Sequence, residues 1–168
     1  MPNIRQTHCL NCPGGQSQNP ACSRANQPLS KEFNSSSVLL IFQAPGIDEW
    51  NTGQPIISQG SRSAAARIRN SLVRLGKSRG DFDITNSVQC YPGKNSTGRD
   101  KRPSETMRKN CQSWLATDIA SHYQTIVVFG ACAKKSVLAL GYSNDSRFKF
   151  LNHPSGGLTN LDLDNALR

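Results

Sequence analysis

The chain has 168 residues, enough for one domain with a substantial core and short for two, so we expect a single domain over residues 1–168. Its 20 lysines and arginines against 11 aspartates and glutamates give a formal net charge of +9, which fits a surface for a polyanion. It has no run of about 18 apolar residues, and its first ten residues lack the apolar centre of a signal peptide. These features predict a cytoplasmic protein without a membrane span.

Apolar runs and helical periodicities alternate along the first half of the chain. Val38–Phe42 is a continuous apolar run, typical of a strand covered on both faces. Residues 13–36 are rich in Gly, Pro, Ser, Asn and Gln and are predicted as a loop, and a second loop is expected from Phe42 to about Gly60. From Ser61 to Lys77, apolar residues recur at helical spacing among arginines, which predicts a basic amphipathic helix.

The second half continues the alternation. Strands are predicted at 82–88, 125–129 and 148–151, and helices at 104–119, 131–140 and 158–167. Strands that alternate with helices predict the α/β class, here a three-layer α/β/α arrangement with a central, mostly parallel four-stranded sheet. Ligands bind such sheets at the carboxyl ends of the strands, where Gln43, Asn86 and His153 are expected.

Three short motifs follow these strands in order: Gln43-Ala44-Pro45-Gly46, Thr85-Asn86-Ser87 and Asn152-His153-Pro154-Ser155. The first and the third motif are each, when alone, more typical of an ordinary turn, so the order of the three motifs carries the signal. The set resembles the uracil-DNA glycosylase superfamily, and its closest branch is the iron–sulfur branch called family four. The resemblance covers roughly residues 9 to 156. It implies an enzyme that turns a pyrimidine out of DNA and hydrolyses its N-glycosidic bond.

Four of the six cysteines are candidate metal ligands. Cys9 and Cys12 form a C-x-x-C pair, Cys90 ends a predicted strand, and Cys111 lies within a predicted helix. Tetrahedral sulfur suits either zinc or a [4Fe-4S] cluster, and spacing alone does not separate them. The resemblance favours the [4Fe-4S] cluster on these four residues, with Cys22 as an alternative fourth ligand. The sixth cysteine, Cys132, is predicted to be a core residue.

The resemblance places Gln43 and Ala44 on the loop that positions the attacking water. Family four usually reads Gly-Glu-Ala-Pro-Gly there, whereas this chain reads Phe42-Gln43-Ala44-Pro45-Gly46. An amide orients a water but accepts no proton from it. The nearest carboxylates are Asp48 and Glu49, of which Asp48 is the candidate catalytic residue. Ala44 is expected to contact the base.

Two positions are expected to recognise the base. Asn86 matches the family's pyrimidine-reading asparagine, whose amide suits the edge of uracil or, turned over, the edge of cytosine. Ile56 stands where the family has a phenylalanine that stacks on uracil, and such stacking contributes about 1–3 kcal/mol per base. The loss of the ring either weakens uracil binding or makes room for another base.

The resemblance also implies a hydrogen-bond donor and several contacts with DNA. His153 matches the histidine that donates to the base oxygen on which charge develops. Contacts with the DNA backbone are expected from Arg62, Lys94, Ser155 and Gly156, and Arg67 is also expected to face a phosphate.

Three functions remain open at this stage. The first is a monofunctional, monomeric glycosylase that acts on uracil in DNA. The second is a glycosylase for a bulkier modified cytosine, as in phage DNA, which would make the protein a defence enzyme. The third is a noncatalytic iron–sulfur protein that binds DNA.

Overall fold

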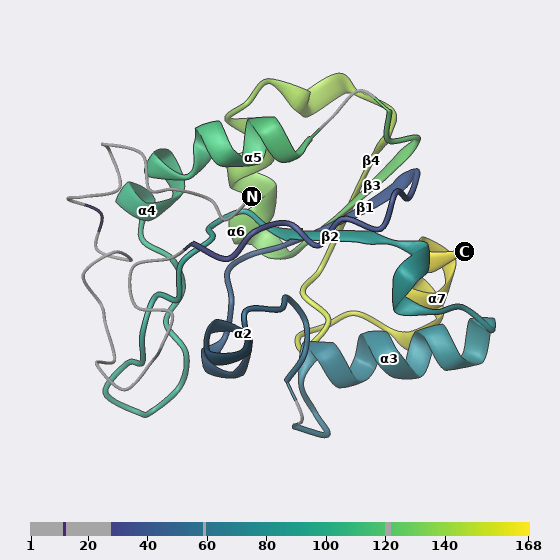
Figure 1. Ribbon diagram of the computed structural model, residues 1–168, viewed down its shortest axis with the longest axis horizontal. Coiled ribbons are helices and arrows are strands. Elements are labelled where there is room, and N and C mark those ends of the chain that lie inside the picture. Colours follow the sequence, from purple (N-terminus) through teal and green to yellow (C-terminus); the bar gives the residue numbers. More distant parts are fainter. Residues whose placement is uncertain (1–11, 13–27, 59, 120–121) are drawn as a thin grey trace.

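The computed structural model describes residues 12, 28–58, 60–119 and 122–168 (Figure 1). Its centre is a sheet in the order β2-β1-β3-β4, in which every neighbouring pair of strands is parallel. The strands are β1 (Val38–Phe42), β2 (Asp83–Asn86), β3 (Thr125–Phe129) and β4 (Phe148–Leu151). This confirms the predicted α/β class.

The described residues form six α-helices. They are α2 (Ile47–Thr52), α3 (Ala64–Leu75), α4 (Glu105–Asn110), α5 (Gln112–Asp118), α6 (Gly130–Leu138) and α7 (Asn160–Leu167). Figure 1 shows α3 and α7 on one side of the sheet and α5 on the other.

The side chains of the buried strands point alternately to the two faces of the sheet, which explains the three layers. Leu40 and Phe42 of β1 join one apolar cluster with residues of α3 and α7, whereas Leu39 and Ile41 join a second cluster with residues of α5 and α6. Successive side chains of a strand point to opposite faces, so a continuous apolar run serves both cores. The predicted three-layer α/β/α arrangement is confirmed.

Two predicted elements are corrected. The loop expected from Phe42 to Gly60 contains α2, because the Glu49 carboxylate accepts a hydrogen bond from the backbone N–H of Gly46 and Gly53 ends the helix at φ +76°. The single helix expected over 104–119 is two short helices that meet at Cys111, whose side chain is buried.

The strand register brings the three motifs to one edge of the sheet. Phe42 is paired with Asn86, and Phe129 is paired with Leu151. Beyond β1 and β2, the N–H of Val88 donates to the carbonyl of Gln43 at 3.0 Å and fixes that turn. Gln43, Asn86 and His153 therefore follow the carboxyl ends of β1, β2 and β4. Among the described residues, no helix is long and apolar enough to span a membrane.

Candidate active site

A cavity of about 500 Å³ opens at this edge of the sheet. Segments that are distant in sequence line it, and they bring together seven of the predicted site residues: Gln43, Ala44, Asp48, Ile56, Lys94, His153 and Ser155. Asn86 is buried beside it at the end of β2, next to Phe42, which lines the cavity. Arg62 and Gly156 are exposed and outside the cavity lining.

His153 is arranged as a neutral hydrogen-bond donor. Its Nδ1 lies 2.7 Å from Ser155 Oγ and 3.3 Å from the backbone N–H of Ser155. A backbone N–H only donates, so Nδ1 is the acceptor and the neutral ring carries its proton on Nε2. Burial lowers the pKa of His153 below its usual 6.5, which keeps the ring neutral at pH 7.

Two residues fix the segment 152–158, here called the His153 loop. Gly130, at φ +88°, packs closely against His153, because a Cβ there would lie only 3.3 Å from the Cβ of His153. Arg67 of α3 donates to the carbonyls of Pro154 and Leu158, the latter at 2.6 Å. The guanidinium predicted to face a phosphate therefore holds the His153 loop instead.

The opposite wall carries Gln43 and two carboxylates of α2. Within the described residues, the Gln43 side chain makes no hydrogen bond, so its amide is available to orient a water. Asp48 accepts a hydrogen bond from Ser58 Oγ at 2.9 Å. Glu49 is buried, and its pKa is raised by burial and by the nearby charges of Asp48 and Asp100.

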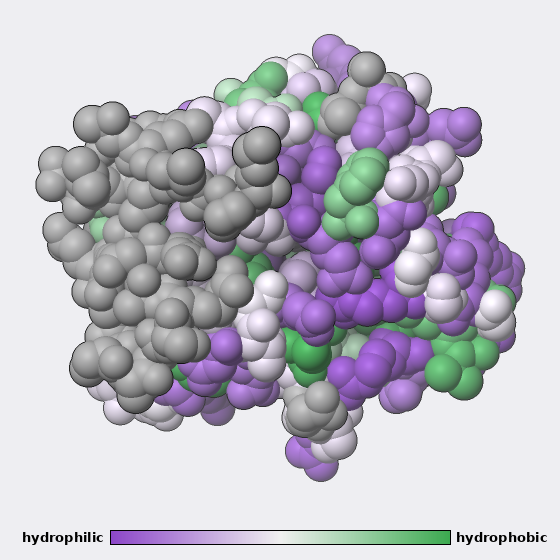
Figure 2. All heavy atoms as spheres, in the orientation of Figure 1, coloured by the Kyte–Doolittle hydropathy of each residue, from purple (hydrophilic) through white to green (hydrophobic). Residues whose placement is uncertain are grey.

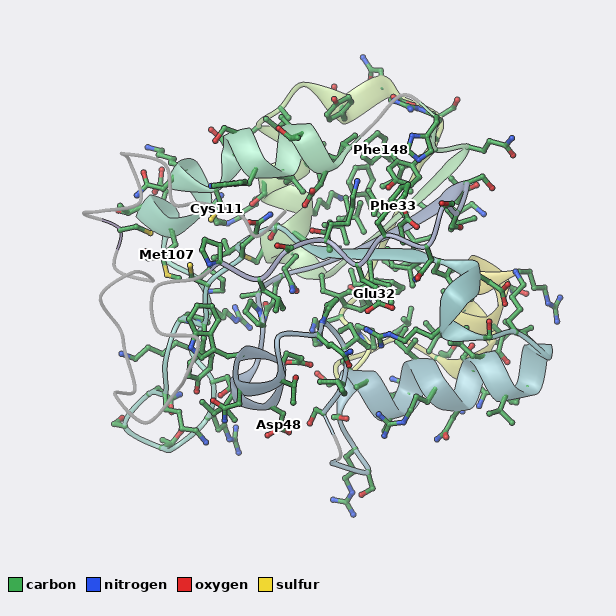
Figure 3. The ribbon with its side chains drawn as sticks, viewed as in Figure 1. Glu32, Phe33, Asp48, Met107, Cys111 and Phe148 are labelled. Carbon is green, nitrogen blue, oxygen red and sulfur yellow. The ribbon has the colours of Figure 1, made fainter. Side chains whose placement is uncertain are left out.

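Ile56 occupies a strained position in the same wall. Its φ is +53°, in the left-handed region that a β-branched residue rarely adopts and that costs on the order of 1–3 kcal/mol. Arg79 donates to the carbonyls of Pro55 and Ile56 and pairs with Glu32 at 2.5 Å (Glu32 is labelled in Figure 3). This arginine fixes the segment 54–58, here called the Ile56 segment.

Asn86 has an unsatisfied acceptor. Its side chain is 3% exposed, and Oδ1 makes no hydrogen bond within the described residues. A buried acceptor without a partner costs roughly 1–3 kcal/mol. The N3–H group of uracil or the N4–H group of cytosine would satisfy it.

Comparison with known proteins identifies the family. The sequence model of the uracil DNA glycosylase superfamily matches residues 30–167. The chain belongs to this superfamily. The type-4 uracil-DNA glycosylase of Pyrobaculum aerophilum is 30% identical over 104 residues, which cover 61% of this chain and 48% of that protein. The chain thus spans about half the length of this curated relative, and the resemblance to family four is confirmed.

Among the described residues of this superfamily member, no cysteine lines the cavity, although Ala44 and Ile47 of the cavity wall pack against the cluster that holds three of them. Cys12, Cys90 and Cys111 share one buried cluster with Trp50 and Met107, and Figure 3 shows Met107 beside Cys111, apart from Asp48 on α2. Cys9 and Cys22 lie outside the described residues. Cys132 is half-buried and belongs to none of the three apolar clusters.

The donor chemistry of the described cysteines fits a thiolate-bound metal or cluster. Cys12, Cys90 and Cys111 are free, buried thiols of one apolar cluster. Thiolates are the ligands of both structural zinc and [4Fe-4S] clusters. Within the described residues, no group of three histidine, cysteine, aspartate or glutamate side chains that could hold one metal ion is present.

The predicted contacts with DNA border the cavity. Arg62, Lys94, Ser155 and Gly156 are all exposed, and two of them, Lys94 and Ser155, also line the cavity. In Figure 2, hydrophilic side chains cover much of the described part of the visible face.

Sequence reasoning missed two residues of this site and gave a third the wrong role. Asp100 lines the cavity and accepts a hydrogen bond from the Tyr91 hydroxyl at 2.8 Å. Gly130, the first residue of α6, packs against His153, and Arg67 of α3 holds the His153 loop rather than a phosphate. An internal glycine directly after an apolar strand was a usable signal for Gly130. The other two contacts depend on tertiary packing.

Proposed function

We propose that the protein is a monofunctional DNA glycosylase that binds a flipped pyrimidine, uracil in the first instance, and hydrolyses its N-glycosidic bond. The unsatisfied, buried Oδ1 of Asn86, at the sheet edge that also bears His153, carries the proposal. A site that reads a base needs such a buried acceptor, and a merely structural asparagine would be satisfied by its neighbours.

His153 and Gln43 have different roles in the proposed reaction. The bond between the sugar C1′ and the base nitrogen breaks, and its electron pair leaves with the base. Nε2–H of His153 donates to the base oxygen on which this charge develops, a stabilisation that commonly contributes about 10²–10³ in rate. Gln43 orients the water that attacks C1′, and its amide does not remove the proton.

The carboxylates of α2 supply the charge that Gln43 lacks. Asp48 is exposed at the cavity and accepts only the Ser58 hydrogen bond within the described residues, which leaves it able to receive a proton from the water. Its negative charge also stabilises the positive charge on the sugar in the transition state. Ala44, with its small side chain, leaves room for the base at the cavity wall.

A [4Fe-4S] cluster on Cys9, Cys12, Cys90 and Cys111 belongs to the same proposal. When bound, it would join the N-terminal segment to the end of β2 and the α4–α5 junction. Hydrolysis transfers no electrons, so this role is structural. DNA is the proposed partner, bound by a cytoplasmic monomer through Arg62, Lys94, Ser155 and Gly156.

The activity test uses oligonucleotides with one uracil, scored for abasic sites by alkaline cleavage. The wild-type protein should produce them, and His153→Ala should slow the reaction by about 10²–10³. His122→Ala is the matched control, because His122 is exposed and distant from the cavity lining. Tight DNA binding without abasic sites on any pyrimidine would instead support the noncatalytic alternative.

Iron analysis tests the cluster. The purified protein should be brown, and Cys90→Ala should lose iron, whereas Cys132→Ala should keep it. Zinc in place of iron would contradict the cluster. Iron retained in Cys22→Ala would exclude Cys22 as a ligand.

A further inference from the structure

We propose that the cavity has an outer compartment, formed by Ser58, Arg99 and Asp100, that binds a polar, hydroxyl-rich substituent on the flipped pyrimidine. This inference rests on the proposed glycosylase function and narrows its substrate class to cytosines that carry such a group, for example a hexose on a 5-hydroxymethyl arm.

The cavity is larger than a single base requires. At about 500 Å³ it falls within the range of roughly 300–1,000 Å³ that encloses drug-sized ligands. A uracil is a single six-membered ring. The cavity therefore has volume beyond the base, bounded by α2 and by residues 91–102, here called the basic loop.

The basic loop is an ordered part of the cavity wall. Lys94 and Asp100 form an antiparallel bridge, and the N–H of Asn95 donates to the carbonyl of Arg99 at 2.8 Å. The Oδ1 atom of Asn95 accepts from the N–H groups of Thr97 and Arg99, each at 3.0 Å. These bonds close the turn and hold the loop residues that line the cavity, which are Lys94, Gly98, Arg99 and Asp100.

The mixture of charges favours hydroxyl groups over a phosphate. Asp48 and Asp100 share the cavity with Lys94 and Arg99, and none of the four forms a salt bridge within the described residues. Carboxylates repel a phosphate, whereas a sugar hydroxyl both donates to a carboxylate and accepts from a cation.

The Ile56 segment completes the argument. An aromatic ring at this position would cover one face of a flat base. Ile56 has a smaller side chain, and the segment is held in an unfavourable backbone conformation by Arg79. The structure thus maintains an open base site next to the outer compartment.

The experiment compares three oligonucleotides that carry uracil, 5-hydroxymethylcytosine or hexosylated 5-hydroxymethylcytosine at one position. The wild-type protein should form abasic sites from the hexosylated base. Arg99→Ala and Asp100→Asn should slow that reaction by about tenfold or more, the size expected for a lost hydrogen bond to a charged group. On the smallest base that is cleaved, the rate of Arg99→Ala should stay within about twofold of the wild-type rate.

Asp100→Asn keeps the Oδ1 acceptor for Tyr91, which protects the fold. The matched control is Lys101→Ala, which removes an exposed cation of the basic loop that does not line the cavity. Circular dichroism establishes that each variant is folded.

The outcomes separate this inference from the proposed function. Cleavage of uracil alone would overturn the outer compartment and leave the glycosylase proposal intact. An equal loss on all three substrates in Arg99→Ala, with a reduced salt dependence, would identify a phosphate contact and also overturn it. A wild-type protein that forms no abasic sites from any substrate would overturn both.

Discussion

The His153 loop and the Ile56 segment are two walls of one cavity, and an arginine holds each of them. Arg67 binds the carbonyls of Pro154 and Leu158, and Arg79 binds those of Pro55 and Ile56. The resemblance described above implies a family motif in the His153 loop and a departure from the family pattern in the Ile56 segment. Under the proposed function, this contrast predicts that the His153 loop serves bond cleavage and that the Ile56 segment sets which base is recognised.

Backbone strain differs between the two walls. The close approach behind His153 uses a glycine, Gly130 at φ +88°, a conformation that glycine adopts readily. The Ile56 segment places a β-branched residue at φ +53° and relies on Arg79 to hold it. Substitutions in the His153 loop should therefore affect the rate of cleavage, and those in the Ile56 segment should affect the choice of substrate.

The largest expected effect is that of Gly130→Ala. The new Cβ would lie 3.3 Å from the Cβ of His153, at a backbone φ of +88° that side chains rarely adopt, so His153 must shift by a few tenths of an ångström. This shift should slow the reaction, up to the roughly 10²-fold that a misplacement of about 1 Å can cost. Gly141→Ala is the matched control, because Gly141 has φ +90° and a Cβ added there would meet nothing within 4 Å. Equal rates for the two variants, measured on any cleaved oligonucleotide, would show that Gly130 does not position His153.

Ile56→Phe tests the role of the Ile56 segment in substrate choice. The ring should stack on a flipped uracil and hold or raise the rate on uracil, while it fills the space that a bulkier base needs. Overpacking of that kind costs roughly 1–3 kcal/mol, so cleavage of a modified cytosine should fall. Ile56→Leu serves as the control, since it keeps the volume and removes the β-branch. A wild-type protein that cleaves uracil efficiently and does not cleave modified cytosines would contradict the prediction that the Ile56 segment makes room for a bulkier base.

A smaller effect is expected on the pH dependence of stability. Burial lowers the pKa of His153 in the folded state, so the unfolded chain binds more protons below about pH 6.5. The free energy of unfolding should fall as the pH decreases from about 6.5 towards the folded-state pKa. His153→Gln, which has no such titration, should lose less stability in urea unfolding between about pH 7.5 and 5.5. Parallel curves for the two proteins would contradict the burial of a neutral ring.

The smallest effect is expected for Glu49→Gln. Burial raises the pKa of Glu49, so its stabilising contribution is fully present below about pH 4.5 and is lost as the pH rises through the folded-state pKa. Glutamine keeps the acceptor for the Gly46 N–H and carries no charge. Urea unfolding should show a small gain in stability at pH 7 that disappears in acid, and a loss at pH 7 would mean that the ionised carboxylate is needed.

The amino-acid sequence by itself determined the class of the fold and the order of its strands along the chain. The run Val38–Phe42 is apolar at every position because both faces of the strand are covered, and such a run is visible without coordinates. The same reasoning placed Gln43, Asn86 and His153 at one sheet edge, since parallel strands end on the same side. The ordered motifs also predicted the superfamily, which the comparison with known proteins confirms.

Only the tertiary structure decided which side chains support the site. Arg67 was predicted at a phosphate, yet its guanidinium binds carbonyls of the His153 loop, about 90 residues away in sequence. Asp100 belongs to a polar loop, and only the packing of that loop against α2 brings its carboxylate into the cavity. Ile56, which has a positive φ, accepts a hydrogen bond at its carbonyl from Arg79, and Arg79 pairs with Glu32. These contacts join residues that are far apart in the sequence. No local periodicity predicts them, because the packing of separate elements decides which partners a long side chain reaches.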